Sequence, residues 1–141
     1  MRCFRGTVPV QIRREPGRQG ERRGANPMTL AAIRDLLDCV VLAGEERLDT
    51  EVDTAVAADG MSIVLATPHP RALLITGLTH IQSVRTANVA DISSIVYVRG
   101  NRPNAQAVEL ARSKGIVLLA TRLGMFDTCG ILRDSGIKGA G

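Results

Sequence analysis

The chain has 141 residues, of which 45% are hydrophobic, and this size and composition fit a single domain with one core. Only 2% of the residues are aromatic, which argues against a nucleic-acid module that stacks bases on aromatic rings. The formal net charge of +4 divides into +5 over residues 1–27 and −1 over residues 28–141, so the excess positive charge belongs to the N-terminal segment and not to the body.

Residues 1–27 combine Arg, Gly, Gln and Pro with too few apolar residues to offset the entropy of ordering the segment. One interpretation is a wrongly assigned start, because Met28 is followed at once by a well-formed helix start. The alternatives are a disordered basic arm and an Arg-rich targeting segment. We therefore divide the chain into a disordered Arg-rich tail, 1–27, and a folded domain, 28–141.

The three cysteines, Cys3, Cys39 and Cys129, are far apart and form no CxxC pair or zinc-type spacing. This use of cysteine suits a reducing compartment. No apolar stretch approaches the roughly 20 residues that cross a bilayer, and the N-terminus lacks the apolar segment of a secretory signal. We expect a cytoplasmic protein with no membrane attachment, no cofactor and no metal.

The folded domain begins with a predicted helix that Asn26 or Thr29 caps. The apolar residues of its predicted buried face are Leu30, Ile33, Leu36 and Leu37. Residues 39–43 form a short apolar run, which predicts a strand that ends at Gly44. Residues 51–56 alternate in polarity and are compatible with a second strand.

The next segment, residues 61–66, fits either a strand or a short helix, and Pro68 and Pro70 close it in both cases. An acidic stretch comes before it, comprising Asp49, Glu51, Asp53 and Asp59. Carboxylates can hold a divalent metal, but the loop and edge-strand setting of this stretch favours a solvated surface.

The same sequence pattern then occurs three times: a short apolar run ends in glycine and polar residues, and a helical stretch follows. The runs are residues 72–75, 95–98 and 116–120. Strand, turn and helix in repetition are typical of a parallel sheet. Because ligands of such sheets bind outside the carboxyl ends of the strands, these three endings predict a binding edge.

Each of the three helices has a recognisable start or end. Thr79 and Gln82 match a capping box at the first. Its predicted buried stripe is Ile81, Val84 and Val89. Pro103 suits the first turn of the second helix, and Gly115 suits its end. The third helix is predicted from about residue 125 to 134. Its predicted buried residues are Phe126, Cys129 and Leu132.

Together these elements predict a single three-layer α/β/α domain with a mostly parallel sheet of about five strands. The scarcity of aromatic residues agrees with this fold class, because small aliphatic side chains let helices lie close on a sheet.

His80 is the sharpest candidate for function. We expect it in the first turn of a helix at the carboxyl end of a strand, where free N–H groups disfavour a protonated ring. A largely neutral imidazole near pH 7 can bind a ligand, and Thr76, Gly77 and Thr79 can offer hydroxyls and backbone donors to an anion beside it. The alternative is a surface histidine that helps to cap the helix.

The turn formed by Arg99, Gly100, Asn101 and Arg102 is the second candidate. Gly100 permits a backbone turn that other residues resist. Arg99 and Arg102 can grip a phosphate or a carboxylate, and Arg122, after the last strand, can join them. The alternative is a solvated loop in which Asn and Gly serve the turn.

Catalytic motifs are absent from the sequence: it contains no GxGxxG, no GxxxxGK[ST] and no GxSxG. We therefore assign no catalytic residue. A nucleophile pairing of Cys39 or Cys129 with His80 stays open, although both thiols lie in apolar stripes, where burial makes a thiol inert.

The segment from about residue 28 to 139 resembles the DRTGG domain family, in particular its small stand-alone members encoded beside iron-iron hydrogenases. The matching stretches are residues 29–37, 74–76 with 79–81, 100–104, Phe126 and 136–139. The Asp-Arg pair that the family pattern has after the first turn is replaced by Leu78-Thr79-His80, and its Thr-Gly-Gly is Val98-Arg99-Gly100.

The resemblance implies an α/β domain like the N-terminal domain of HPr kinase, in a family of regulatory or dimerisation modules with no reaction assigned. We therefore expect a non-enzymatic regulatory or accessory module that binds a small anionic ligand, a nucleotide or phosphate-like group, at the strand ends. We also expect a homodimer, a link to hydrogenase-system proteins, and no nucleic-acid partner. The alternatives are a protein-interaction or dimerisation module without a ligand, and a metal or acid–base enzyme dependent on His80.

Overall fold

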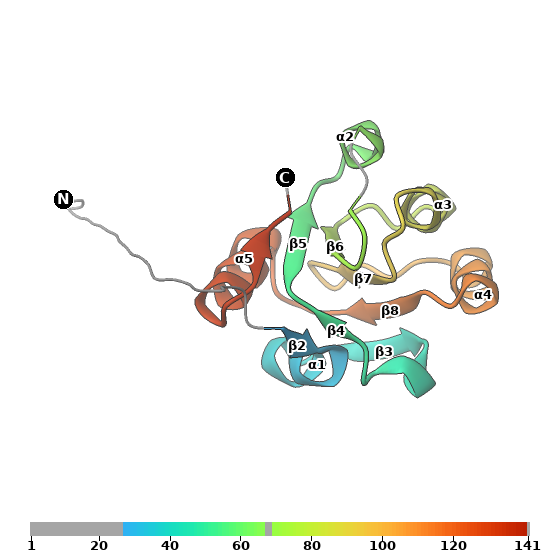
Figure 1. The fold of residues 1–141 in the computed structure, drawn as a ribbon. Coiled ribbons are helices and arrows are strands. Elements are labelled where there is room, and N and C mark those ends of the chain that lie inside the picture. Colours follow the sequence, from blue (N-terminus) through green and yellow to red (C-terminus); the bar gives the residue numbers. More distant parts are fainter. Residues whose placement is uncertain (1–26, 67–68, 141) are drawn as a thin grey trace.

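The computed structural model describes residues 27–66 and 69–140. The segment predicted as a tail lies outside the described residues up to residue 26, as do Cys3 and Pro68. The middle layer is a six-stranded sheet (Figure 1). In spatial order its strands are β3 (Val40–Ala43), β8 (Val117–Ala120), β7 (Ser94–Tyr97), β6 (Leu73–Thr76), β5 (Thr54–Ala57) and β9 (Lys138–Gly139). A separate two-stranded sheet pairs β2 (Met28–Thr29) with β4 (Glu51–Val52).

The sheet is parallel from β8 to β9, and β3 alone is antiparallel to its neighbour. Leu74, Ile95 and Leu118 lie opposite one another in the central register. The sequence predicted about five strands, and β9 is the additional one. Because β3 is antiparallel to β8, its first residue, Val40, lies opposite Ala120 at the carboxyl end of β8.

Helices cover both faces of the sheet, which confirms the predicted α/β architecture (Figure 1). On one face lie α1 (Leu30–Leu37) and α5 (Met125–Asp134); on the other lie α2 (Met61–Leu65), α3 (Ile81–Val89) and α4 (Ala105–Lys114). A 3₁₀ helix, η1 (Glu45–Arg47), follows β3. No helix in the described part of the chain has the length and apolar character needed to span a bilayer.

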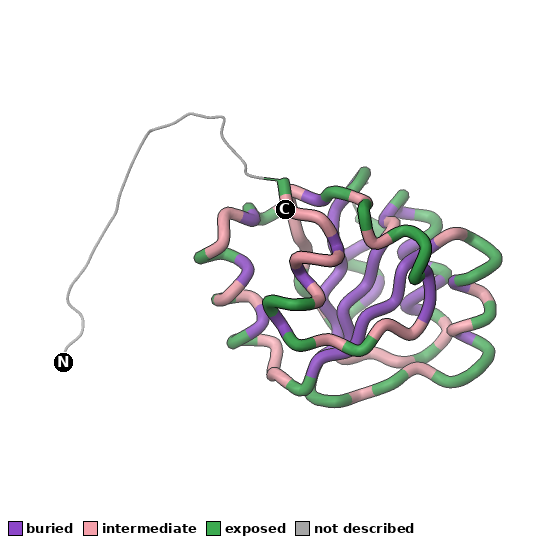
Figure 2. The backbone as a smooth tube through the Cα atoms, turned by 90° about the horizontal axis from the view of Figure 1, so that it is seen from below, coloured by how far each residue is buried: buried purple, intermediate pink, exposed green. Residues whose placement is uncertain are grey.

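The three central strands are buried along their whole length, as the purple strands in Figure 2 show. Alternate residues serve the two faces: Leu74 and Tyr97 pack toward α2, α3 and α4, whereas Leu73 and Val96 pack toward α1 and α5. The Tyr97 hydroxyl is 2.8 Å from the Ser83 hydroxyl, so this large buried ring has a partner for its polar group.

Side-chain caps mark two of the helix starts, although Pro103, predicted in the first turn of α4, lies before its cap Asn104. The Thr29 hydroxyl accepts from the Ala32 N–H at 3.1 Å, and the Asn104 side chain accepts from the Ala107 N–H at 2.9 Å, so each caps a helix. Gly115 ends α4 in the left-handed conformation at φ 71°. The ambiguous segment 61–66 forms α2, because Gly60 and the following prolines leave room for little more than one turn.

Some predicted elements and buried residues were wrong. The strand predicted over 51–56 is two strands, β4 and β5, which belong to different sheets. Leu36, Val89 and Phe126 are 41%, 73% and 89% exposed. The physical reason is angular: residues two apart on a helix lie about 200° apart. Burial of Ala87 therefore turns Val89 outward, and burial of Thr128 turns Phe126 outward.

Candidate functional site

The carboxyl ends of β5, β6, β7 and β8 lie in a row at one edge of the sheet. The ladder of hydrogen bonds continues past the strand ends, since the Val98 N–H donates to the Thr76 carbonyl at 3.1 Å. The Thr121 N–H likewise donates to the Tyr97 carbonyl at 2.9 Å. The turns after the strands are therefore held side by side, as the repeated pattern in the sequence predicts.

Asp59 belongs to the turn after β5, and its side chain contacts the turn after β6. Its Oδ1 accepts the Gly77 N–H at 2.7 Å and the Thr76 hydroxyl at 3.2 Å. Its Oδ2 lies 3.8 Å from Arg99 Nη2. The donors that the sequence assigned to a bound anion are thus used by a carboxylate of the protein itself. We call Asp59, Thr76, Gly77 and Arg99 the Asp59 cluster.

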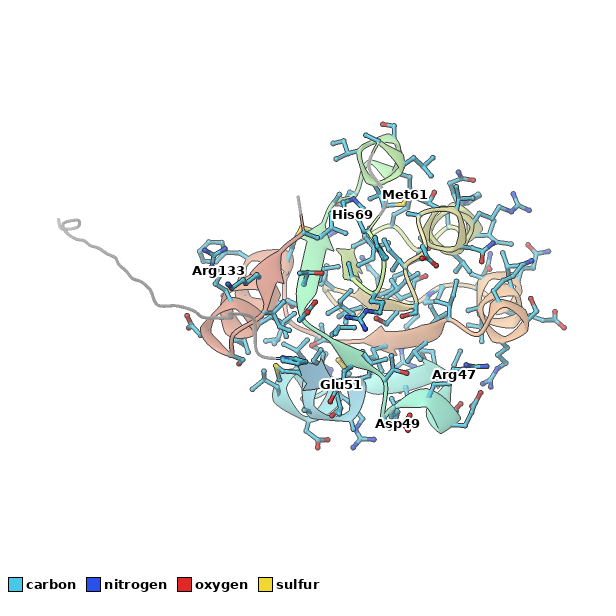
Figure 3. The ribbon with its side chains drawn as sticks, viewed as in Figure 1. Arg47, Asp49, Glu51, Met61, His69 and Arg133 are labelled. Carbon is cyan, nitrogen blue, oxygen red and sulfur yellow. The ribbon has the colours of Figure 1, made fainter. Side chains whose placement is uncertain are left out.

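Sequence reasoning missed this role of Asp59 and placed it in a solvated acidic stretch. Figure 3 shows Asp49 and Glu51 at the lower end of the molecule, whereas Met61, two residues after Asp59, lies at the upper end. The stretch is therefore not one cluster. Asp59 follows a strand that ends at the same edge as β6, and that position was the available signal.

Gly77 lies directly under the guanidinium of Arg99. A Cβ at Gly77 would collide with Arg99 Nη2 and lie 2.9 Å from its Cζ, so glycine permits this close approach. The Asn101 side chain adds a long contact of 3.4 Å from its Nδ2 to the Gly77 carbonyl. The turn after β7 therefore folds over the turn after β6.

The turn after β7 is left-handed at two successive residues, with φ of 62° at Arg99 and 73° at Gly100. Its N–H groups are already engaged: Arg99 donates to the Leu123 carbonyl at 2.7 Å and Gly100 to the Thr121 carbonyl at 2.9 Å. An anion at this turn would therefore be held by side chains. The backbone donor predicted at Gly77 is taken by Asp59, and the N–H groups of Arg99 and Gly100 are bonded within the protein.

A hollow of about 480 Å³ lies beyond this turn, where β3 starts and β8 ends. It is lined by Asp38, Cys39, Val40, Gly100, Arg102, Ala120, Thr121 and Arg122. We call it the arginine hollow. The antiparallel β3 creates it, because the start of β3 stands beside the end of β8. The Thr121 hydroxyl donates to the Leu37 carbonyl at 2.7 Å and ties this edge to α1.

Both arginines of the hollow are exposed, and within residues 27–66 and 69–140 neither forms an ion pair. The single carboxylate that lines the hollow is Asp38, at the end of α1. The hollow thus combines two guanidinium groups with one carboxylate, and its balance of charge favours an anion.

Within the described parts of the chain, His80 forms no hydrogen bond or ion pair with the Asp59 cluster. It is the residue that caps α3, since its Nδ1 accepts the Gln82 N–H at 3.2 Å; the predicted cap was Thr79, one residue earlier. His80 is exposed, and neither it nor Thr79 lines the arginine hollow. The predicted site residues therefore fall into three groups. Those that line the arginine hollow are Gly100, Arg102 and Arg122. Those of the Asp59 cluster are Thr76, Gly77 and Arg99, with Asn101 beside them, and those at the start of α3 are Thr79 and His80.

Both described thiols are protonated at neutral pH. Burial, together with the nearby Asp38 carboxylate, raises the pKa of Cys39 to about 12, and burial raises the pKa of Cys129. Both pKa values are raised, whereas a thiol that acts as a nucleophile needs a lowered pKa. Across the described ranges, no group of three or more His, Cys, Asp or Glu residues is arranged to hold a metal ion.

We expect Asp59→Ala to lower the free energy of unfolding by about 1 kcal/mol, because it leaves the Gly77 N–H and Arg99 without their acceptor at a half-exposed position. Asp49→Ala, at an exposed position, is the matched control and should change stability by less than about 0.5 kcal/mol. Urea unfolding followed by circular dichroism measures both. Equal midpoints for the two variants would contradict the structural role of Asp59.

We also expect stability to fall at alkaline pH. Burial raises the pKa of Cys39 from about 9 to about 12, and burial likewise raises the pKa of Tyr97 and of Cys129. A group whose pKa is higher in the folded state stabilises the fold fully below its unfolded pKa, and that contribution is lost as the pH rises toward the folded pKa. Urea midpoints should therefore fall from pH 9 upward, less steeply in Cys39→Ala. A slope that is the same in both proteins would refute the assignment to Cys39.

Comparisons with known proteins bear on the fold. No family model matches the chain, and no curated protein sequence matches it. A solved structure is similar: the CBS and DRTGG domains of the regulatory region of Clostridium perfringens pyrophosphatase, complexed with the activator diadenosine tetraphosphate. The TM-score is 0.65 at 19% sequence identity, over 77% of this chain and 47% of that chain. This chain therefore spans about half the length of that one, and the likeness shows that the two share an α/β fold.

Proposed function

We propose that this chain is a non-enzymatic regulatory or accessory module that binds a small anionic ligand, a nucleotide or phosphate-like group, in the arginine hollow. One observation carries the proposal: Arg102 and Arg122, from the turns after two neighbouring strands, line one hollow of about 480 Å³. Guanidinium groups pair with phosphate through two parallel hydrogen bonds. The volume lies within the range of about 300 to 1,000 Å³ found for small-molecule sites.

The Asp59 cluster supports this choice of site over the turn after β6. Because the Asp59 carboxylate neutralises Arg99 and takes the Gly77 N–H, an anion there would have to displace it. In the arginine hollow, neither arginine is ion-paired within the described residues, although the Asp38 carboxylate lines the same hollow. Val40, which is 47% exposed on the wall of the hollow, adds apolar surface against which a nucleotide base can lie.

The similar solved structure supports a regulatory role. It is a regulatory region of a pyrophosphatase, and the ligand in that complex is diadenosine tetraphosphate, a polyanionic nucleotide activator. A domain of the same fold thus belongs to a region that is complexed with a phosphate-bearing ligand, which agrees with the proposal that Arg102 and Arg122 hold an anion.

Calorimetric titration tests the proposal with AMP, ATP, diadenosine tetraphosphate and inorganic phosphate at fixed ionic strength. We expect saturable binding of at least one of them, and an at least tenfold loss of affinity in the double variant Arg102→Gln/Arg122→Gln, since each charged hydrogen bond lost costs about 1.5 kcal/mol or more. Arg85→Gln, an exposed arginine on α3 away from the hollow, is the matched control. No binding of any of these anions at millimolar concentration, or equal affinity in all variants, would refute it.

A second candidate function is a protein-interaction or dimerisation module that needs no ligand. Ile63 on α2 and Val89 on α3 favour it, since they are 66% and 73% exposed on two helices that contact each other.

Following the family resemblance, we propose that the chain acts as a cytoplasmic homodimer linked to hydrogenase-system or redox proteins. Sedimentation equilibrium should then give twice the monomer mass for the unmodified chain. The double variant Ile63→Ser/Val89→Ser should give a lower mass, closer to that of the monomer. A monomer at all concentrations would remove the homodimer.

A further inference from the structure

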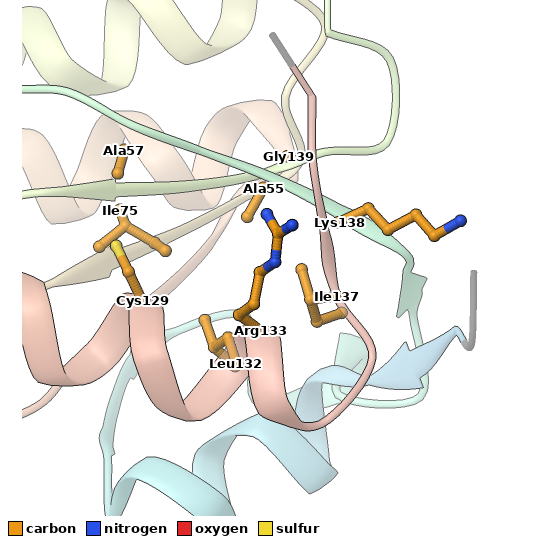
Figure 4. A pocket seen from close by; sticks show the side chains of 9 residues that line it. All are labelled: Ala55, Ala57, Ile75, Cys129, Leu132, Arg133, Ile137, Lys138 and Gly139. Carbon is orange, nitrogen blue, oxygen red and sulfur yellow. The ribbon is translucent and has the colours of Figure 1, made fainter. Parts of the chain in front are cut away.

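A second cavity lies at the opposite edge of the sheet, on the face covered by α1 and α5 (Figure 4). It occupies the space between β5, the outer strand β9 and α5, and its volume is about 230 Å³. Its lining comprises Ala55, Ala57, Ile75, Cys129, Leu132, Arg133, Ile137, Lys138 and Gly139. We call it the apolar pocket. No carboxylate side chain lines it.

The pocket exists because small residues stand at the edge of the sheet. Ala55 lies opposite Gly139 in the parallel pairing of β5 with β9, so both positions face the same side. Ala57 follows two residues later on the same face of β5. Three larger side chains at these positions would fill the space between the sheet and α5.

The walls of the pocket are apolar and fixed in the core. Ile75, Leu132 and Ile137 are only 2%, 1% and 4% exposed, and they come from β6, α5 and the segment before β9. Cys129 adds a thiol that burial keeps protonated by raising its pKa, so its sulfur behaves as a small apolar group. A ligand here would therefore be recognised through hydrocarbon contact.

The guanidinium of Arg133 places a positive charge beside this apolar surface. In Figure 4 the guanidinium of Arg133 lies across the pocket, near Ala55 and Ile137, whereas the side chain of Lys138 extends away from it. Within the described parts of the chain neither residue is ion-paired. A guanidinium beside apolar walls can bind a carboxylate whose hydrocarbon part lies in the pocket.

We propose that the apolar pocket binds a small apolar carboxylate, an aliphatic or single-ring acid, with its hydrocarbon part against Ile75, Leu132 and Ile137 and its carboxylate on Arg133. Size sets the ligand class. A protein cavity of about 150 Å³ holds one benzene ring, so a pocket of this volume holds a chain of roughly six to eight carbon atoms. Burial of each further methylene should raise affinity about threefold to fourfold until the pocket is full.

This site is separate from the proposed anion site. The arginine hollow is lined from β3, β8 and the turn after β7, whereas the apolar pocket is lined from β6, β5, β9 and α5, and the two share no lining residue. The ligands differ as well, since the hollow favours a phosphate and the pocket favours a hydrocarbon chain with one negative charge. Either proposal can therefore fail while the other stands.

Two-dimensional ¹H–¹⁵N NMR titration of the full chain tests the proposal with butanoate, hexanoate and octanoate at fixed ionic strength. We expect the amide signals of Cys129, Leu132 and Gly139 to shift, with an affinity that rises with chain length. Hexanol, which lacks the charge, should bind at least fivefold more weakly than hexanoate, and inorganic phosphate should not shift these signals. Shifts spread over the whole surface, or an affinity independent of chain length, would overturn the proposal.

Three variants separate the hydrocarbon contact from the charge. Gly139→Val should weaken binding strongly, because Gly139 lines the pocket beside Ala55 and a larger side chain at this position occupies space at the β9 wall. Ala57→Leu fills the same space from β5 and serves if the first variant is unstable. Arg133→Gln should lower the affinity for hexanoate at least fivefold and leave the affinity for hexanol unchanged. Lys138→Gln is the matched control, and an equal loss in it would show general electrostatic attraction and overturn the role of Arg133.

Discussion

Parallel pairing of β6, β7 and β8, with both faces of these strands buried, is the constraint on which the candidate site depends. Leu74, Ile95 and Leu118 lie opposite one another, and their burial fixes the register, since a slip of one residue would turn every apolar side chain to the other face. The strands therefore end at the same level. The turns that carry Gly77, Arg99 and Arg122 are brought together by core packing, although they are far apart in sequence.

At the carboxyl edge of the sheet, one arginine is paired with a carboxylate and two are unpaired among the described residues. Asp59 accepts from Gly77 and faces Arg99, so the turns after β5, β6 and β7 are tied by one carboxylate. Arg102 and Arg122 have no such partner among the described residues and face open space. The Asp59 carboxylate thus ties one half of the edge together, and in the other half Arg102 and Arg122 stay exposed.

Much of the fold could be predicted from the sequence, because its signals are local. Three apolar runs ending in glycine mark β6, β7 and β8, and Thr29 and Gly115 mark helix ends. The contacts that shape the site are not local. The antiparallel pairing of Val40 with Ala120 joins residues far apart in the chain, and the Asp59 contacts span turns with no pattern in common. A strand of two residues such as β9 has no periodicity to detect.

The brevity of β9 bears on how a molecule could reach the apolar pocket. Beyond α5, this wall is fastened to β5 by the Lys138 N–H on the Asp53 carbonyl at 3.1 Å and the Ala140 N–H on the Ala55 carbonyl at 2.9 Å. Bonds at the rim of a sheet open at the free-energy cost of local fraying, far below that of global unfolding. Fraying of these two hydrogen bonds would widen the apolar pocket on its β9 side while β6, β7 and β8 stay paired.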